Sequence, residues 1–321
     1  MGDPRVIEAT APGKQVLAGE YAVLAGAPAL AAAVDRRVTC RISPASTGNW
    51  SFVSHGYEAQ GTYPRDNLPE TGPAALARFA MTSLDLDTRT LPAHLKIQID
   101  SRPFYQGAEK LGFGSSAACA VAVTGALAEL AGATPTLENA LAAHRSLQGG
   151  GGSGVDVAAS WCGGVIRFQD GVARSARLPP DIHHMFVFTG VGVDTPTLVR
   201  RFDAWRGAES PPELRALVRS ATAVAESGTY YLEALAEYIE TLLAFDRAAR
   251  IDIFSAEHLH MMRLAKGFGV LYKPCGAGGD MGMGVSQDLD VLAACRGRIE
   301  REGFAVLPAE ISRHGLQLRF R

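Results

Sequence analysis

A glycine loop between a predicted strand and a predicted helix constrains the fold of this chain more than any other stretch. The loop reads Lys-Leu-Gly-Phe-Gly-Ser-Ser-Ala-Ala over residues 110–118. Before it, residues 95–100 alternate between apolar and polar side chains, as in a half-buried strand. After it, small and apolar residues recur at helical spacing as far as Leu130. The sequence therefore predicts a strand, a glycine loop and a helix, in that order.

The residues of this loop suit an anion site. Gly112 and Gly114 allow positive φ and a close approach of the backbone to a ligand, and the serine pair Ser115 and Ser116 suits the cap of the next helix. A helix N-terminus presents unpaired N–H groups and the positive end of the helix dipole, which favours phosphate. The loop is not a Walker A motif, because no Gly-Lys-Ser/Thr ends it, and it is not a Rossmann fingerprint, because the Gly-x-Gly-x-x-Gly spacing is missing. A tight serine-capped turn without a ligand remains an open interpretation of this segment alone.

Composition excludes several classes of protein. The 321 residues fit one large or two ordinary domains, and a formal net charge of −2 without a basic stripe argues against nucleic acid as a partner. The five cysteines are scattered without Cys-x-x-Cys spacing, which favours reduced thiols over disulfides or zinc. Charged residues interrupt the N-terminal segment, and the longest apolar run, residues 117–127, is too short to span a bilayer. We therefore expect a soluble cytoplasmic protein without a membrane partner.

The rest of the chain predicts a mixture of helices and strands. The first strand is expected at residues 6–11 and should end at the Pro-Gly pair that follows. Further strands are expected at residues 34–42, 50–53, 165–168, 172–178, 185–190, 270–275, 283–286 and 315–320, and helices at 137–147, 195–245 with breaks, 255–266 and 288–302. In the helix at 255–266, Leu259, Met262 and Leu264 are expected on the buried side. This mixture predicts an α+β fold, with a domain boundary at the Pro-Pro pair after residue 178.

Two single charges lie beside glycine turns. Lys14 follows Pro12 and Gly13, where it could contact a phosphate, although a lone lysine is often only solvated. Asp156 follows four consecutive glycines at residues 149–152 and would lie in the first turn of a short helix capped by Ser153. There it could act in a site or simply stabilise the helix start through the dipole.

Three glycine-rich segments in this order resemble the motifs of the GHMP kinase superfamily. The first runs from Ala11 through Lys14 to Leu24, the second is the loop at residues 110–118, and the third is Lys-Pro-Cys-Gly-Ala-Gly-Gly at residues 273–279. Together they span nearly the whole chain. The sequence departs from the family pattern at Phe113, where leucine is usual, and at Asp280, which follows the third loop one glycine early.

Within the superfamily the chain most resembles the phosphomevalonate kinases. Tyr21 stands where mevalonate and galactose kinases usually carry histidine, and residues 144–149 and 153–159 are also similar to that branch. Arg145 lies near the position of a metal-binding glutamate of mevalonate kinases. A cation there would suit an acceptor that carries its own phosphate.

This resemblance implies a two-domain fold, at residues 1–178 and 179–321, with an N-terminal domain like ribosomal S5 domain 2 and a ferredoxin-like C-terminal domain. It implies Lys14 and Asp156 as catalytic residues, and Ser116 with Asp156 as ligands of Mg²⁺. The residues implied for ATP binding are Lys110, Gly112, Gly114, Ser115, Ser116 and Ala117. Those implied for acceptor binding are Glu20, Tyr21, His144, Arg145, Ser153, Gly154, Gly276, Ala277 and Gly278.

The implied reaction is transfer of a phosphoryl group from ATP to 5-phosphomevalonate, giving 5-diphosphomevalonate, by a monomer or homodimer. The second pKa of a phosphate monoester is about 6, so Asp156 would orient the acceptor more than deprotonate it. Three alternatives stay open. They are a mevalonate kinase or another small-molecule kinase of the superfamily with Asp156 as general base, a diphosphomevalonate decarboxylase, and a nucleotide-binding regulator without turnover.

Overall fold

The computed structural model describes residues 6–190, 195–207 and 210–320. The chain forms two compact units. Unit 1 comprises Met1–Lys14, Ala33–Gly164 and Ile311–Arg321, and unit 2 comprises Gln15–Ala32 and Val165–Glu310. These limits differ from the expected boundary after residue 178, because the C-terminal residues return to unit 1 and pair with its first strand.

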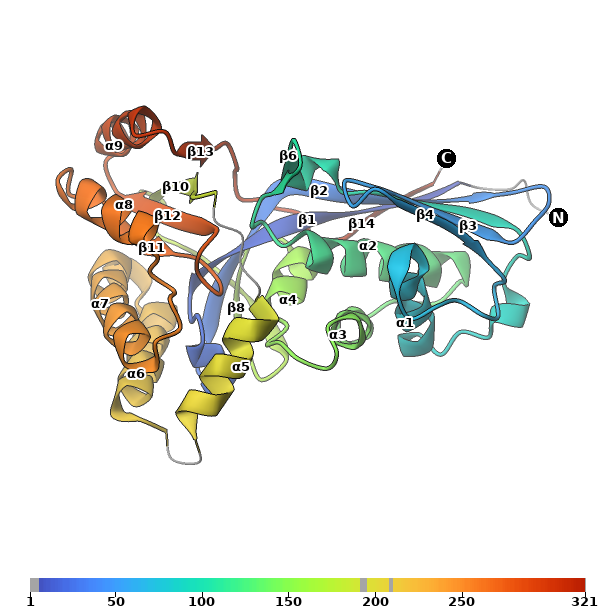
Figure 1. The fold of residues 1–321 in the computed structure, drawn as a ribbon, viewed down its shortest axis with the longest axis horizontal. Coiled ribbons are helices and arrows are strands. Elements are labelled where there is room, and N and C mark those ends of the chain that lie inside the picture. Colours follow the sequence, from blue (N-terminus) through green and yellow to red (C-terminus); the bar gives the residue numbers. More distant parts are fainter. Residues whose placement is uncertain (1–5, 191–194, 208–209, 321) are drawn as a thin grey trace. The chain divides into compact units, whose positions relative to one another are not determined.

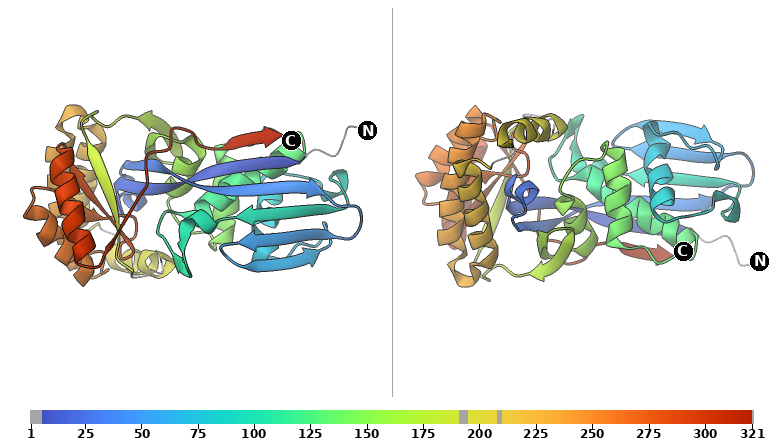
Figure 2. Two further views of the ribbon diagram at one scale, coloured as in Figure 1. Left: turned by 90° about the horizontal axis from the view of Figure 1, so that it is seen from above. Right: turned by 90° about the horizontal axis from the view of Figure 1, so that it is seen from below.

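A mixed sheet forms one layer of unit 1 (Figure 1). Its strands are β1 (Ile7–Ala18), β2 (Ala29–Pro44), β3 (Trp50–His55), β4 (Ala59–Tyr63), β5 (Leu95–Asp100) and β14 (Gln317–Phe320), in the order β14-β1-β2-β5-β3-β4. β3 and β5 are parallel, whereas β14 pairs antiparallel with β1. The left view of Figure 2 shows β14, in red, beside the blue β1. The predicted C-terminal edge strand is therefore confirmed.

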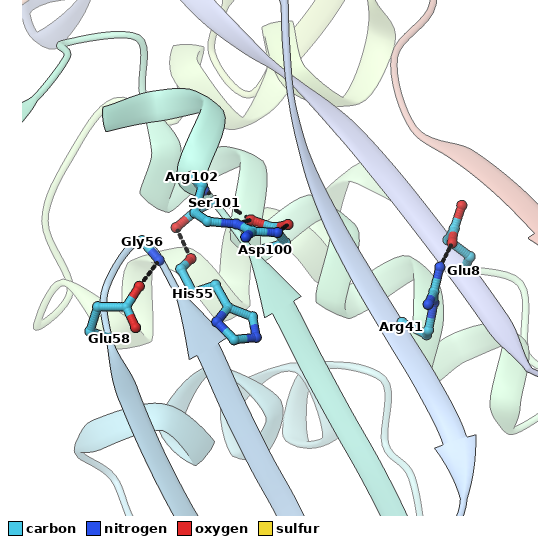
Figure 3. A network of polar contacts seen from close by, with 8 residues as sticks. All are labelled: Glu8, Arg41, His55, Gly56, Glu58, Asp100, Ser101 and Arg102. Atoms are coloured by element: carbon cyan, nitrogen blue, oxygen red, sulfur yellow. Dashed lines mark hydrogen bonds and ion pairs between the residues drawn. The ribbon is translucent and has the colours of Figure 1, made fainter. Parts of the chain in front are cut away.

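Helices cover one face of this sheet (Figure 1). They are α1 (Ala75–Ser83), α2 (Ser115–Leu130), α3 (Leu137–Leu147) and α4 (Val155–Cys162), joined by the short helices η2 (Gly72–Ala74), η3 (Thr88–Thr90) and η4 (Arg102–Phe104) and the hairpin β6 (Tyr105–Gln106) and β7 (Glu109–Lys110). Most of α2 is buried, which explains its small and apolar composition. The opposite face of the sheet carries polar residues. Arg41 forms an ion pair with Glu8 at 2.7 Å, and Asp100 forms one with Arg102 (Figure 3).

Unit 2 contains an antiparallel four-stranded sheet with helices packed on it. Its strands are β11 (Leu271–Pro274), β12 (Met281–Ser286), β10 (His183–Phe188) and β13 (Ala305–Leu307), in the order β11-β12-β10-β13. Residues of α8 (Ala256–Lys266) and α9 (Leu289–Arg301) form a core with Met185, Val187 and Tyr272 of the sheet. The unit also holds η1 (Ala22–Ala25), β8 (Val165–Gln169), β9 (Val172–Ala176), α5 (Thr195–Arg206), α6 (Pro212–Glu226), η5 (Gly228–Tyr230) and α7 (Tyr231–Ala249). Residues 29–32 of β2 pair with β8.

The predicted α+β class is confirmed, and three local predictions are wrong. β1 does not end at Pro12 and Gly13 but continues to Ala18. The buried side of α8 carries His258, Met261 and Ala265 instead of the three residues expected there. The helix caps expected from serines are provided by glycines, as described below. In the described residues, no helix is both long enough and apolar enough to cross a membrane.

Candidate functional site

Lys14 lies directly against the glycine loop of unit 1. Its backbone N–H donates to the carbonyl oxygen of Phe113 at 2.8 Å. A Cβ built on Gly114 would lie 2.8 Å from Lys14 Cε and 2.9 Å from Lys14 Cγ. The aliphatic part of the lysine side chain therefore crosses this glycine, and any larger residue at position 114 would displace it. This contact brings the predicted catalytic lysine to the start of α2.

The start of α2 explains why a glycine is needed at that point. Gly114 is the N-cap residue in the left-handed conformation, at φ 76°, and provides no side-chain cap. The prediction that the serine pair caps this helix is therefore wrong, because Ser115 and Ser116 are its first two residues. With no side-chain cap at Gly114, the first N–H groups of α2 are suited to an anion. Ala117 is fully buried, and its methyl side chain has no polar group for a ligand.

Asp156 lies in the first turn of α4, on the face that meets β1. Gly154, at φ 85°, is the N-cap of α4, while Ser153 only accepts a bond from the Val155 N–H at 3.4 Å, so the serine cap predicted here is also wrong. Ser160 donates from Oγ to the carbonyl oxygen of Pro12 at 2.6 Å. Since Asp156 precedes Ser160 by one helical turn, both share that face.

β1 presents Pro12 and Lys14 to the same side, because residues two apart in a strand share a side. Lys14 follows two residues after Pro12, whose carbonyl oxygen is the contact of β1 with Ser160 of α4. Both predicted catalytic charges, Lys14 and Asp156, are half-buried. Both belong to unit 1.

The C-terminal end of α3 adds a histidine and an arginine. His144 is buried, and its Nε2 lies 3.3 Å from Ser116 Oγ. Arg145 is exposed, and its Nη2 lies 3.7 Å from where a Cβ on Gly154 would stand. These contacts join α3 to the starts of α2 and α4. Lys110 lies in β7 on an exposed hairpin, four residues before Gly114.

The remaining predicted residues form a second cluster, in unit 2. Tyr21 donates from its hydroxyl to the carbonyl oxygen of Ala277 at 2.9 Å, and the Gly276 N–H donates to Glu20 Oε1 at 3.4 Å. Gly278 passes so close to Ile253 that a Cβ would lie 2.6 Å from Ile253 Cα. The first and third predicted motifs are therefore in contact.

A buried ion pair holds this cluster together. Lys273 Nζ pairs with Glu20 Oε1, and their side chains are 1% and 0% exposed. Tyr238 donates from its hydroxyl to Glu20 Oε2 at 2.6 Å. Burial, and next the nearby Glu20 carboxylate, raises the pKa of Tyr238 well above its ordinary value. Both oxygens of Glu20 are thus occupied by protein groups.

Sequence reasoning missed Lys273 and Tyr238 as members of this cluster. One signal for Lys273 was available, since it is the charged residue in an otherwise apolar strand segment, Val-Leu-Tyr-Lys-Pro. A buried charge needs a partner, and Glu20 is the buried carboxylate of the first motif. Tyr238 gave no comparable signal, because a tyrosine in a helix is common in cores.

Comparison with known proteins identifies the family. Residues 75–164 match the family described as GHMP kinases N terminal domain. In an alignment of 375 positions, gaps included, the chain is 29% identical to the phosphomevalonate kinase of Streptomyces sp. (strain CL190), covering 97% of this chain and 99% of that relative. Residues 75–164 therefore form a GHMP kinase N-terminal domain. With this domain, and with a kinase matched over nearly its whole length, the chain is a phosphotransferase, and the matched residues include the glycine loop, Arg145 and Asp156.

Other relatives and solved structures agree on the fold. The chain is 29% identical to the mevalonate kinase of Bos taurus, over 60% of this chain and 61% of that relative. A Lin0012 protein from Listeria innocua has a TM-score of 0.84 at 21% identity, covering 98% of this chain and 99% of that chain. The Streptococcus pneumoniae phosphomevalonate kinase in complex with phosphomevalonate and AMPPNP has a TM-score of 0.75 at 17% identity, covering 94% and 99%. At these identities the structures show a shared fold.

Proposed function

We propose that this kinase transfers the γ-phosphoryl group of ATP to the phosphate of 5-phosphomevalonate, forming ADP and 5-diphosphomevalonate. The observation that carries this proposal is the extent of one match. The Streptomyces phosphomevalonate kinase aligns with 97% of the chain, whereas the mevalonate kinases found align with between 51% and 64% of it. The mevalonate kinases therefore align with only part of the chain, whereas the phosphomevalonate kinase aligns with nearly all of it.

The start of α2 and Lys14 are the groups that we assign to ATP. Anions bind helix N-termini through free N–H groups and the helix dipole, and Gly114 leaves this end without a side-chain cap. Lys14 is packed across Gly114, so its ammonium would neutralise charge that develops on the transferring phosphoryl group. Because phosphoryl transfer depends mainly on positioning and electrostatics, this arrangement supplies what the reaction needs.

Arg145 is the group that we assign to the phosphate of the acceptor. Two phosphates must meet in this reaction, and one pair of unit charges 4 Å apart repels by about 4 kcal/mol at an effective dielectric constant near 20. The exposed guanidinium of Arg145 beside Gly154 offers a planar donor set that suits a phosphate, and the buried His144 supports the same end of α3. Lys110 could add positive charge near the loop.

Asp156 would orient the acceptor and would hold Mg²⁺ together with Ser116. Mg²⁺ is usually bound by one or two protein oxygens together with substrate phosphates and water, and these two side chains provide a carboxylate and a hydroxyl. The bound ion would neutralise charge on the phosphates. Because the acceptor phosphate is mostly ionised at neutral pH, with a second pKa of about 6, the reaction does not require Asp156 to remove a proton.

A mevalonate kinase is the second candidate, favoured by the 32% identity to the enzyme of Pyrococcus abyssi over 52% of this chain. In that reaction the acceptor is an alcohol, and Asp156 would be a general base whose pKa appears in the pH–rate profile. A diphosphomevalonate decarboxylase would also release ADP.

Measuring ADP release with mevalonate, phosphomevalonate and diphosphomevalonate separates these reactions. We expect turnover with phosphomevalonate and little with the other two. Turnover with mevalonate alone would establish the second candidate, and turnover with diphosphomevalonate accompanied by CO₂ would establish the decarboxylase. Absence of turnover with all three would reject the proposed function.

A further inference from the structure

Phe113 fills the centre of the glycine loop with an aromatic ring. The residue is fully buried, and the guanidinium carbon of Arg36 lies 5.2 Å from the centre of its ring. This distance is within the range of a cation–π contact. Leucine, which is usual at this position of the GHMP kinase motif, would fill the space but would offer no π face to a cation.

Arg36 is itself held in place by the backbone. Its Nη1 donates to the carbonyl oxygen of Pro103 at 2.8 Å. The next residue of β2, Arg37, points to the other side of the strand, where it donates to the carbonyl oxygens of Thr10 at 3.0 Å and Gly315 at 2.6 Å. The two adjacent arginines thus contact different parts of unit 1. Arg37 holds the C-terminal segment, and Arg36 reaches the glycine loop.

Phe113 is tied to both parts of the proposed ATP site in unit 1. Its N–H donates to the Leu111 carbonyl oxygen at 2.7 Å, and its own carbonyl oxygen accepts from the Lys14 N–H at 2.8 Å. A Cβ on Gly13 would lie 2.7 Å from that carbonyl oxygen and 2.8 Å from Cε1 of Phe104. The backbone at Gly13 and Lys14 is therefore packed against the carbonyl group of Phe113, so a shift of the backbone at Phe113 would move Lys14 and Gly114 together.

We infer that Arg36 is a positioning residue for the nucleotide phosphates, acting through the ring of Phe113. The guanidinium holds the ring, the ring fixes residues 112–114, and these fix the start of α2 and the backbone of Lys14. This inference rests on the proposed use of the α2 start as the ATP phosphate site. It does not depend on which acceptor is phosphorylated.

The test combines Arg36→Met, Phe113→Leu and the double variant, with Arg89→Met as the control. Arg89 is an exposed arginine of η3 that pairs with Asp87. The dissociation constant of AMPPNP is measured for each variant below its melting temperature, and kcat and both KM values are measured with the acceptor that supports turnover. Since a cation–π contact contributes about 0.5–2 kcal/mol, each single variant should weaken AMPPNP binding by about twofold to thirtyfold.

The double variant should bind AMPPNP about as well as either single variant, because both remove the same contact. Arg36→Lys, which keeps a cation, should restore most of the binding, and KM for the acceptor should stay unchanged. Unchanged AMPPNP binding in both single variants, or losses that multiply in the double variant, would overturn the inference. A lower melting temperature with unchanged AMPPNP binding would show a structural role only.

These outcomes are distinct from failure of the proposed function. If wild-type protein binds AMPPNP but does not turn over phosphomevalonate, the acceptor assignment fails and the binding series still decides the role of Arg36. If wild-type protein binds no AMPPNP, both proposals are rejected.

Discussion

At the scale of single residues, most of the proposed chemistry depends on Lys14. The lysine is fixed by its backbone bond to Phe113 and by the packing of its side chain on Gly114. Sequence reasoning could propose this residue, because a lysine after Pro-Gly in the first motif is conspicuous. It could not predict that Gly114 would be both the cap of α2 and the surface on which the lysine packs, since that contact joins residues 100 positions apart.

We expect Lys14→Met to lower kcat by on the order of 10² to 10³, the usual loss when one preorganised electrostatic group is removed. Binding of ATP should change far less, because the N–H groups of α2 remain. The measurement is kcat together with a direct ATP dissociation constant, and Lys96→Met, at an exposed position of β5, is the matched control. Turnover equal to that of wild type would reject the role assigned to Lys14.

For Arg145→Ala we expect a rise in KM for phosphomevalonate of about tenfold to a hundredfold, from the loss of hydrogen bonds to a charged group worth about 1.5–3 kcal/mol. KM for ATP should be nearly unchanged. Arg145→Lys should recover only part of the loss, since an ammonium cannot form the two parallel bonds of a guanidinium. An increase confined to KM for ATP would contradict the assignment of Arg145 to the acceptor.

At the scale of elements, local patterns predicted some helices and strands closely and missed others for identifiable reasons. The predicted bounds of α3 agree with the structure because Thr136 and Asn139 form a capping box at its start. β1 passes through Pro12 because the carbonyl oxygen of that residue faces Ser160 rather than a neighbouring strand, so its missing N–H interrupts no ladder. The pairing of β1 with β14 extends only from Ile7 to Thr10, where β14 begins at Gln317, so it stops two residues before Pro12.

For α8 the predicted helix is present, but the residues predicted on its buried side are each one position away from the residues that are buried. The expected Met262 is only partly buried, while Met261 and His258 face the core. Apolar residues on both sides of the helix left the periodicity ambiguous, and a polar histidine gave no sign of burial. His258 is placed there by its contact with Tyr272, where Nδ1 lies 2.9 Å from the hydroxyl oxygen.

This buried histidine predicts a pH dependence of stability. Burial lowers the pKa of His258 to about 4, below the value of about 6.5 expected in the unfolded chain. Between these values the unfolded state binds a proton that the folded state does not, so the free energy of unfolding falls as the pH is lowered through this window. From pH 7 to pH 5 the loss from this residue should be roughly 2 kcal/mol.

Urea denaturation at pH 7 and pH 5 measures this loss. His258→Gln should reduce the difference between the two pH values, because glutamine does not titrate, whereas His314→Gln, at an exposed position, should leave it unchanged. The same pH dependence in wild type and His258→Gln would show that other groups cause it.

At the scale of the whole molecule, the motifs predicted from sequence divide between the two units. Lys14, the glycine loop, Arg145 and Asp156 belong to unit 1, and the contact of Glu20 and Tyr21 with the third loop belongs to unit 2. The mixture of predicted helices and strands was enough to predict the α+β class, and the order of the motifs was enough to predict a resemblance to the GHMP kinases. It could not predict the division of the chain, because the pairing of β1 with β14 joins the two ends of the sequence and leaves no local pattern.

The chemistry expected of the whole chain is the formation of a phosphoanhydride bond on the acceptor. Phosphorus NMR of a reaction containing ATP, Mg²⁺ and 5-phosphomevalonate observes that bond directly. We predict that the monoester resonance declines and that two mutually coupled diphosphate resonances appear in step with those of ADP. An unchanged monoester resonance, with or without release of inorganic phosphate from ATP, would contradict the account.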